Sequence, residues 1–191
     1  MSRNRALSNY PGRIITLLAL MLATVLVLST LDVSEADARK RKINVVQCST
    51  QTGFTCEGTD RKDRLYGKNQ TNGAHEVIRG KEGNDIYDDR GGIDSLEDAS
   101  TTSSDSYLFS GASFGPTDQI VDAGGSSDKV DLSQTTFRLF DNTAIRKTDF
   151  DGDTQADDLE ISGPEGTVYI SDHFGSGKME TINFANATVS Y

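Results

Sequence analysis

The stretch from Gly80 to Glu97, GKEGNDIYD followed by DRGGIDSLE, consists of two nine-residue units in tandem. Each unit has a glycine, an aspartate two residues later and a large apolar residue after two more: Gly83, Asp85 and Tyr87, then Gly92, Asp94 and Leu96. Glycine permits a tight turn, the aspartate adds a carboxylate beside the turn carbonyls, and the apolar residue points inward from a short strand. One unit cannot bury its single apolar side chain. The period therefore predicts that units stack into a parallel coil, with a shared core inside and ions between the loops.

Acidic residues at the same position recur through the middle of the chain, each followed two residues later by an apolar residue. The acids are Asp63, Glu76, Asp85, Asp94, Asp105, Asp118 and Asp128, and the apolar residues are Leu65, Ile78, Tyr87, Leu96, Tyr107, Ile120 and Val130. If two units make one turn, the first, third, fifth and seventh acids stack along one edge and the other three along the opposite edge. The longer gaps between some units need loop insertions, and no window after the N-terminal region has a convincing helical period.

The tandem units resemble the haemolysin-type (RTX) calcium-binding nonapeptide G-G-x-G-x-D-x-U-x, where U is a large apolar residue. The resemblance implies an all-β fold, with a short parallel β-roll (right-handed β-solenoid) over residues 58–132. It also implies Ca²⁺ as the cofactor, held by position-six carboxylates and turn carbonyls. Carried over unit by unit, it names Asp63, Asp85, Asp94, Asp105, Asp118 and Asp128 as ligands, with Gly83 and Gly92 as backbone support. Several units lack the family's glycines, and the alternative is that Gly- and Asp-rich loops are merely turns.

Residues 133–191 resemble the module that often caps such arrays at the C-terminal end. Alternating apolar residues at 157–161, 167–174 and 179–189 predict strands, and 163–166 predicts a turn between the first two. We therefore expect a β-rich C-terminal cap that covers the open end of the stack, where an exposed edge promotes aggregation.

A second acidic pattern lies inside this predicted cap. Counted from Asp149, acids fall at positions 1, 3, 5, 9 and 12, which resembles an EF-hand loop: Asp149, Asp151, Asp153, Asp157 and Glu160. Thr154 stands at position six, where that loop needs glycine, and no helical pattern flanks it. A bare acidic calcium loop is therefore favoured over a helical EF-hand, and a loop that holds no ion is the alternative.

The N-terminal region predicts export. Arginines precede an apolar run over 14–31, and Ala36-Asp37-Ala38 has the small-x-small pattern of a cleavage site, so residues 1–38 are predicted to be a signal peptide whose helix precedes the β-roll. An uncleaved membrane anchor competes with this interpretation because the run is near the length of a spanning helix. No other segment could span a bilayer, so we expect no stable membrane span after cleavage and a secreted or extracellular protein, with association to the cell surface left open.

Residues 39–57 form a predicted linker, basic over 39–42, that ends in a small loop between Cys48 and Cys56. An oxidising compartment favours a disulfide between these two cysteines. The formal net charge is −10 at pH 7. That charge argues against a nucleic-acid partner, whose phosphates need a Lys/Arg face, and fits a polyanion that divalent cations neutralise.

The leading hypothesis is an exported, non-enzymatic calcium-binding protein whose loops couple calcium binding to folding. The alternative is a calcium-dependent adhesion module with a cell-surface glycan or protein as partner. A third hypothesis is a small hydrolase, since residues 111–115 read G-x-S-x-G around Ser113 and His173 follows. The chain lacks the alternating strand and helix patterns that a nucleophile elbow needs, which disfavours the hydrolase.

Overall fold

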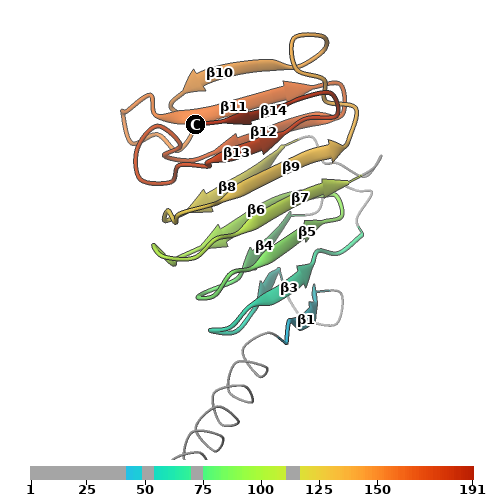
Figure 1. The fold of residues 1–191 in the computed structure, drawn as a ribbon, viewed down its shortest axis with the longest axis vertical. Coiled ribbons are helices and arrows are strands. Elements are labelled where there is room, and N and C mark those ends of the chain that lie inside the picture. Colours follow the sequence, from blue (N-terminus) through green and yellow to red (C-terminus); the bar gives the residue numbers. More distant parts are fainter. Residues whose placement is uncertain (1–41, 49–53, 70–74, 111–116) are drawn as a thin grey trace, which may run out of the picture. The chain divides into compact units, whose positions relative to one another are not determined.

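Short strands joined by turns and loops make up the described chain, which comprises residues 42–48, 54–69, 75–110 and 117–191 of this computed structural model. The unit Ile43–Tyr191 is all-β, without a helix in its described residues, and forms a parallel β-solenoid of about three turns. Figure 1 shows its strands stacked one above another. The predicted fold class is confirmed.

Two seven-stranded sheets form the two walls of the solenoid, because each turn contributes one strand to each sheet. The first sheet has the order β1 (Asn44–Gln47), β3 (Asp63–Tyr66), β5 (Ile86–Asp89), β7 (Ser106–Ser110), β9 (Lys129–Gln134), β13 (Thr181–Asn183), β14 (Thr188–Ser190). The second has the order β10 (Ala144–Thr148), β11 (Asp158–Gly163), β12 (Gly166–Ile170), β8 (Asp118–Asp122), β6 (Ile93–Asp98), β4 (His75–Arg79), β2 (Thr55–Glu57).

Two columns of aligned side chains run through the core between the sheets. Leu65, Tyr87, Tyr107, Val130 and Ile182 align across the first sheet, and Cys56, Ile78, Leu96, Ile120 and Ile170 align across the second. All ten side chains are fully buried. Every apolar residue that the nine-residue pattern placed inside is therefore inside, and burial of about 1.5–3 kcal/mol per large side chain is what holds the stack together.

A disulfide closes the N-terminal end of the core. Cys48 and Cys56 are bonded, with a Cα–Cα distance of 5.2 Å, and both are fully buried. The predicted pairing is present, and a structural disulfide suggests an oxidising, extracellular environment.

The parallel pairing continues into the region expected to be a separate cap. Strand β12 pairs in parallel with β8, and β13 pairs in parallel with β9, so together they add a further turn to the solenoid. Strands β11 and β10 extend the second sheet beyond β12 by antiparallel pairing, and β14 extends the first sheet beyond β13 in the same way. Strands β11 and β12 form a hairpin whose turn lies at 163–166, as the sequence predicts.

Some of the predicted features lie outside the described residues. These are the signal peptide with its helix at 1–38, most of the basic stretch 39–42, and the G-x-S-x-G stretch around Ser113. In the part of the chain that the structure describes, no helix is long and apolar enough to cross a membrane.

Candidate metal sites

Seven acidic residues stack along the two edges of the solenoid, and hydrogen bonds link each one to the next turn. We call them the ladder acids: Asp63, Asp85, Asp105 and Asp128 along the first edge, and Glu76, Asp94 and Asp118 along the other. Along the first edge, the backbone N–H of one ladder acid donates a hydrogen bond to the carboxylate of the ladder acid on the following turn. The distances are 2.8 Å from Asp63 N to Asp85 Oδ1, 2.6 Å from Asp85 N to Asp105 Oδ1 and 2.8 Å from Asp105 N to Asp128 Oδ1. Along the other edge, Glu76 N donates to Asp94 Oδ1 at 3.0 Å, and Asp94 N donates to Asp118 Oδ1 at 2.9 Å.

The second oxygen of most ladder acids is buried without a hydrogen-bond partner in the described structure. This holds for Oδ2 of Asp85, Asp94, Asp118 and Asp128, whose residues are at most 2% exposed. An unpartnered buried carboxylate oxygen is costly, and native structures rarely tolerate one without an ion or a water. These atoms are where a cation would bind.

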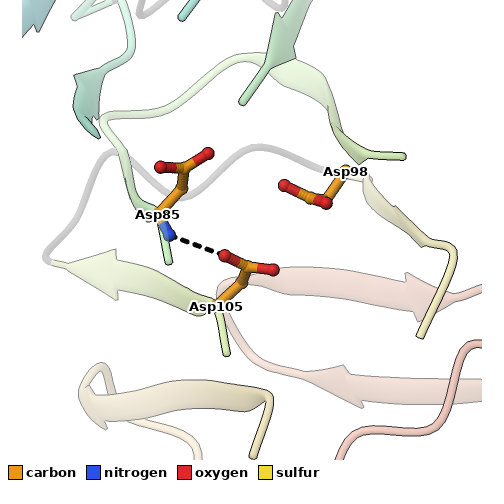
Figure 2. Close-up of side chains that lie close together, drawn as sticks. All are labelled: Asp85, Asp98 and Asp105. Atoms are coloured by element: carbon orange, nitrogen blue, oxygen red, sulfur yellow. Dashed lines mark hydrogen bonds between the residues drawn. The ribbon is translucent and has the colours of Figure 1, made fainter. Parts of the chain in front are cut away.

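A third aspartate joins two ladder acids in each of three buried groups. The first group is Asp85, Asp98 and Asp105, the second is Asp105, Asp122 and Asp128, and the third is Asp89, Asp94 and Asp118. Within a group, one carboxylate oxygen from each residue lies within 4.8 Å of the others. Figure 2 shows the three side chains of the first group close together, with a hydrogen bond from the backbone nitrogen of Asp85 to the carboxylate of Asp105. Asp105 belongs to two groups, so the first two sites are adjacent.

The third aspartates, Asp89, Asp98 and Asp122, were not predicted as ligands. Each follows a ladder acid by four residues and ends a strand, so it lies on the same inward face as that acid. In the nonapeptide pattern this is the first position of the next unit, where glycine is usual, so the pattern assigns no ligand to it. The recurring Asp-x-x-x-Asp spacing was the signal that could have found them.

Burial raises the pKa of these carboxyls. Burial is the main cause of the raised pKa of Asp85, Asp105 and Asp128, each about 7, and of Asp98, about 6. Neighbouring carboxylates add to the effect: for Asp85 they are Asp105, Asp63 and Asp98. At neutral pH, each buried group therefore holds a proton or repels its neighbours, unless a cation compensates the charge.

Glycines leave the space that the ladder carboxylates occupy. A Cβ on Gly80 would collide with Asp85 Oδ2 and with the Tyr87 hydroxyl, and a Cβ on Gly125 would lie within 2.9 Å of both Asp128 oxygens. The predicted support residues Gly83 and Gly92 instead have φ of 120° and 140°, values that few other residues adopt. They shape the turns, while the unpredicted Gly80 and Gly125 lie against the carboxylates.

The ends of the two ladders are bonded to protein groups. Asp63, which belongs to none of the three groups, accepts from Asn44 Nδ2 at 2.7 Å and from the backbone and hydroxyl of Thr59. Glu76 accepts from the backbone N–H of Lys68 at 2.9 Å. At the other end Glu180, which was not predicted, accepts from Asp128 N at 2.7 Å and so continues the first ladder by one turn.

The predicted acidic loop contributes exposed aspartates to two groups whose members differ from the predicted ligand set. Asp149 and Asp151 lie near the buried Asp158, and Asp151 and Asp153 lie near Asp172. Neither Asp157 nor Glu160 belongs to these groups. Glu160 accepts from Ser162 Oγ at 2.6 Å on strand β11 and lies 3.8 Å from Arg146. Thr154, at the position where an EF-hand has glycine, has the positive φ of 78° that glycine would supply.

His173, the predicted partner of Ser113 in the hydrolase hypothesis, is buried in the cap. Its Nδ1 accepts a hydrogen bond from the backbone N–H of Met179 at 3.2 Å, and its ring packs edge-on against Phe174 and Tyr191. Burial lowers the pKa of His173 to about 4, so the imidazole is neutral at pH 7. These contacts account for His173 as a packing residue.

The fold and the three groups define a β-solenoid protein whose edges carry buried aspartates that could hold metal ions. No protein-family model matches the chain, and no curated protein shows significant similarity to it.

Proposed function

We propose that this chain is an exported, non-enzymatic calcium-binding protein of the haemolysin-type (RTX) repeat class, whose folding is coupled to calcium binding. The observation that carries the proposal is the set of buried, unpartnered carboxylate oxygens along both edges, each within a group of three aspartates. In Asp85, Asp94, Asp118 and Asp128, one carboxylate oxygen stabilises the fold by accepting a backbone hydrogen bond, and the other is buried without a partner and is available to an ion. In Asp105 the second oxygen accepts a hydrogen bond from the Ser103 hydroxyl.

The chemistry of the groups favours calcium. All their side-chain ligands are oxygens, and neither His nor Cys belongs to any group among the described residues. Oxygen ligands suit the hard cations calcium, magnesium and manganese, whereas zinc and copper favour sites with nitrogen or sulfur. Loops built from carboxylates and turn carbonyls offer the flexible, high coordination number of calcium more readily than the strict octahedron of magnesium.

Coupling between binding and folding follows from the charge. Three carboxylates within a buried group repel one another, and this repulsion opposes folding until a cation compensates it. Each ion that binds only the folded chain stabilises it by about 2.7 kcal/mol at a hundredfold excess over its dissociation constant. The buried disulfide agrees with export to an oxidising environment.

Calcium titration of the metal-stripped protein, followed by circular dichroism and calorimetry, tests the proposal. We expect heat of binding and a gain of β structure with calcium, and a weaker response to magnesium. Asp85→Asn and Asp94→Asn should each weaken the response. Asp141→Asn is the control, because Asp141 is exposed and pairs with Arg138 on the surface. No heat and an unchanged spectrum up to millimolar calcium would refute the function.

A further inference from the structure

Two inward-facing tyrosines connect the core to the aspartates that complete the first two groups. The hydroxyl of Tyr87 lies 2.9 Å from Asp98 Oδ2 and shares its proton with the Glu97 carbonyl oxygen, also at 2.9 Å. The hydroxyl of Tyr107 lies 2.7 Å from Asp122 Oδ2. Both tyrosines are fully buried, and their rings stack with centroids 4.7 Å apart. Most side chains in the same core columns are aliphatic, so hydrophobic packing alone does not explain why two positions carry a hydroxyl.

The hydroxyl and a backbone N–H together hold both oxygens of each strand-end aspartate. Asp98 Oδ1 accepts from the N–H of Ser100 at 2.7 Å, and Asp122 Oδ1 accepts from the N–H of Gly124 at 2.7 Å. Each carboxylate is thus held at two points, and one of its oxygens lies within 4.8 Å of a carboxylate oxygen of each of two ladder acids. Tyr87 is itself fixed, because its oxygen accepts a 3.0 Å hydrogen bond from the N–H of Gly80.

The third group provides an internal comparison, because it lacks this tyrosine. Ile78 occupies on β4 the inward position that Tyr87 occupies on β5, and Asp89 follows Ile78 at the same separation as Asp98 follows Tyr87. Asp89 accepts a long contact, 3.4 Å, from the N–H of Gly91, and its Oδ1 is buried without a geometric hydrogen-bond partner. Burial raises the pKa of Asp89, and the nearby carboxyl of Asp94 and the backbone of Gly91 and Arg90 partly offset that effect. With Ile78 at the inward position, Asp89 is held by these groups and not by a tyrosine hydroxyl.

We propose that Asp98 and Asp122 are cation ligands in their own right, and that Tyr87 and Tyr107 are positioning residues that orient them toward the ion. This rests on the proposed calcium function and extends it, since it assigns a third carboxylate to each of two sites and an outer-shell partner to that carboxylate. Outer-shell hydrogen bonds of this kind fix the orientation of a ligand before the ion arrives. The third site, around Asp89, is built without that support and binds more weakly.

The test uses calcium binding to the full chain and to Tyr87→Phe and Tyr107→Phe, with Tyr66→Phe as the control. Tyr66 is a partly exposed tyrosine that lies against Arg64 and Arg90 rather than against a carboxylate. We expect the Tyr87 and Tyr107 variants to bind calcium at one site about 10–100-fold more weakly, the usual effect of losing an outer-shell partner. Tyr66→Phe should bind as the unmodified chain does.

A spectroscopic readout separates positioning from simple loss of packing. The chain has no tryptophan, so its near-ultraviolet signal is dominated by its six tyrosines. Calcium binding to Asp98 and Asp122 changes the charge of the atoms that accept the Tyr87 and Tyr107 protons. Calcium should therefore alter the near-ultraviolet tyrosine band, and each Phe variant should lose part of that change. If the tyrosines only pack in the core, the Phe variants should be equally destabilised with and without calcium, and their calcium dissociation constants should not change.

If a Phe variant fails to fold, Asp98→Asn and Asp122→Asn test directly whether these aspartates bind the ion. Asparagine keeps an oxygen that accepts the tyrosine proton but removes the negative charge. We expect each to lose or weaken one ion, and Tyr87→Phe added to Asp98→Asn to weaken binding no further. If the unmodified chain binds no calcium, the proposed function fails as a whole. If it binds calcium and the Asn variants bind as many ions with unchanged affinity, only the present inference is overturned.

Discussion

The backbone N–H of Asp85 donates a 2.6 Å hydrogen bond to the carboxylate of Asp105 on the following turn (Figure 2). One side chain therefore serves the fold and the candidate site together. Its Oδ1 fixes the register of two turns, while the carboxylate as a whole belongs to both groups along the first edge. Loss of its charge should affect ion binding more than loss of any other single aspartate.

Asp105→Asn should weaken calcium binding at two sites, whereas Asp128→Asn should weaken it at one. Asparagine keeps an oxygen for the N–H of Asp85, so the register of the turns is preserved while a shared negative charge is removed. Calorimetry and metal analysis after dialysis measure the number of ions retained. Asp131→Asn is the matched control, because Asp131 lies outside the groups and pairs with Lys129 at 2.9 Å. Equal losses in the Asp105 and Asp128 variants would contradict the shared role.

Gly80→Ala should reduce both stability and calcium affinity. A methyl group there would collide with Asp85 Oδ2 and the Tyr87 hydroxyl, both of which are buried and cannot move far. We expect a loss of about 1–3 kcal/mol in the free energy of unfolding, the usual cost of overpacking.

Gly67→Ala provides the comparison. Gly67 also lies four residues after a ladder acid, but the nearest atoms to its Cβ would be 3.4 Å away. Chemical denaturation of both variants in calcium measures the difference, and equal stabilities would count against the tight contact.

Reduction of the Cys48–Cys56 disulfide should destabilise the N-terminal end of the solenoid. The bond closes a loop of eight residues' separation. In the loop-entropy model such a loop contributes about 2–3 kcal/mol. Thermal unfolding with and without a reductant, in saturating calcium, measures the effect, and a Cys48→Ala/Cys56→Ala double variant should match the reduced protein. A melting temperature that reduction leaves unchanged would show that packing of β1 and β2 alone holds this end.

The nine-residue period predicted the register of the solenoid because burial of the apolar residue and placement of the carboxylate depend on the same strand. A ladder acid and the apolar residue two positions later lie on the same face of a strand, so burial of Leu65, Tyr87 or Tyr107 also fixes where the preceding carboxylate lies. The turns between the strands then set the length of each half-turn. The alignment of each acid with its equivalent on the next turn follows from these two facts alone.

The remainder of the candidate site depends on contacts that the period does not contain. Tyr107 and Asp122 are far apart in sequence, and their hydrogen bond arises only after two half-turns have stacked. Glu180 continues the first ladder beyond Asp128, but strands β10 to β12 lie between the two residues in the sequence. A regular spacing therefore cannot predict that Glu180 belongs to the ladder. Asp172 joins the acidic loop from the turn after β12, in the same way.

The stability of the metal-free protein should fall as the pH rises, and calcium should reverse that dependence. Burial raises the pKa of Asp85, Asp105 and Asp128 from 3.8 to about 7 in the folded state, so the folded chain binds protons that the unfolded chain releases. The stability that these protons provide is fully present below about pH 4 and is lost as the pH rises through about 7. A bound cation instead favours the deprotonated carboxylates, so calcium affinity should increase over the same range and binding at pH 7 should release protons.

Thermal unfolding between about pH 5 and pH 8, with the metal-stripped and the calcium-saturated protein, measures both trends. The heat of binding in two buffers of different ionisation enthalpy counts the protons. A metal-free melting temperature that rises with pH would mean that these carboxylates are ionised and compensated by the protein itself.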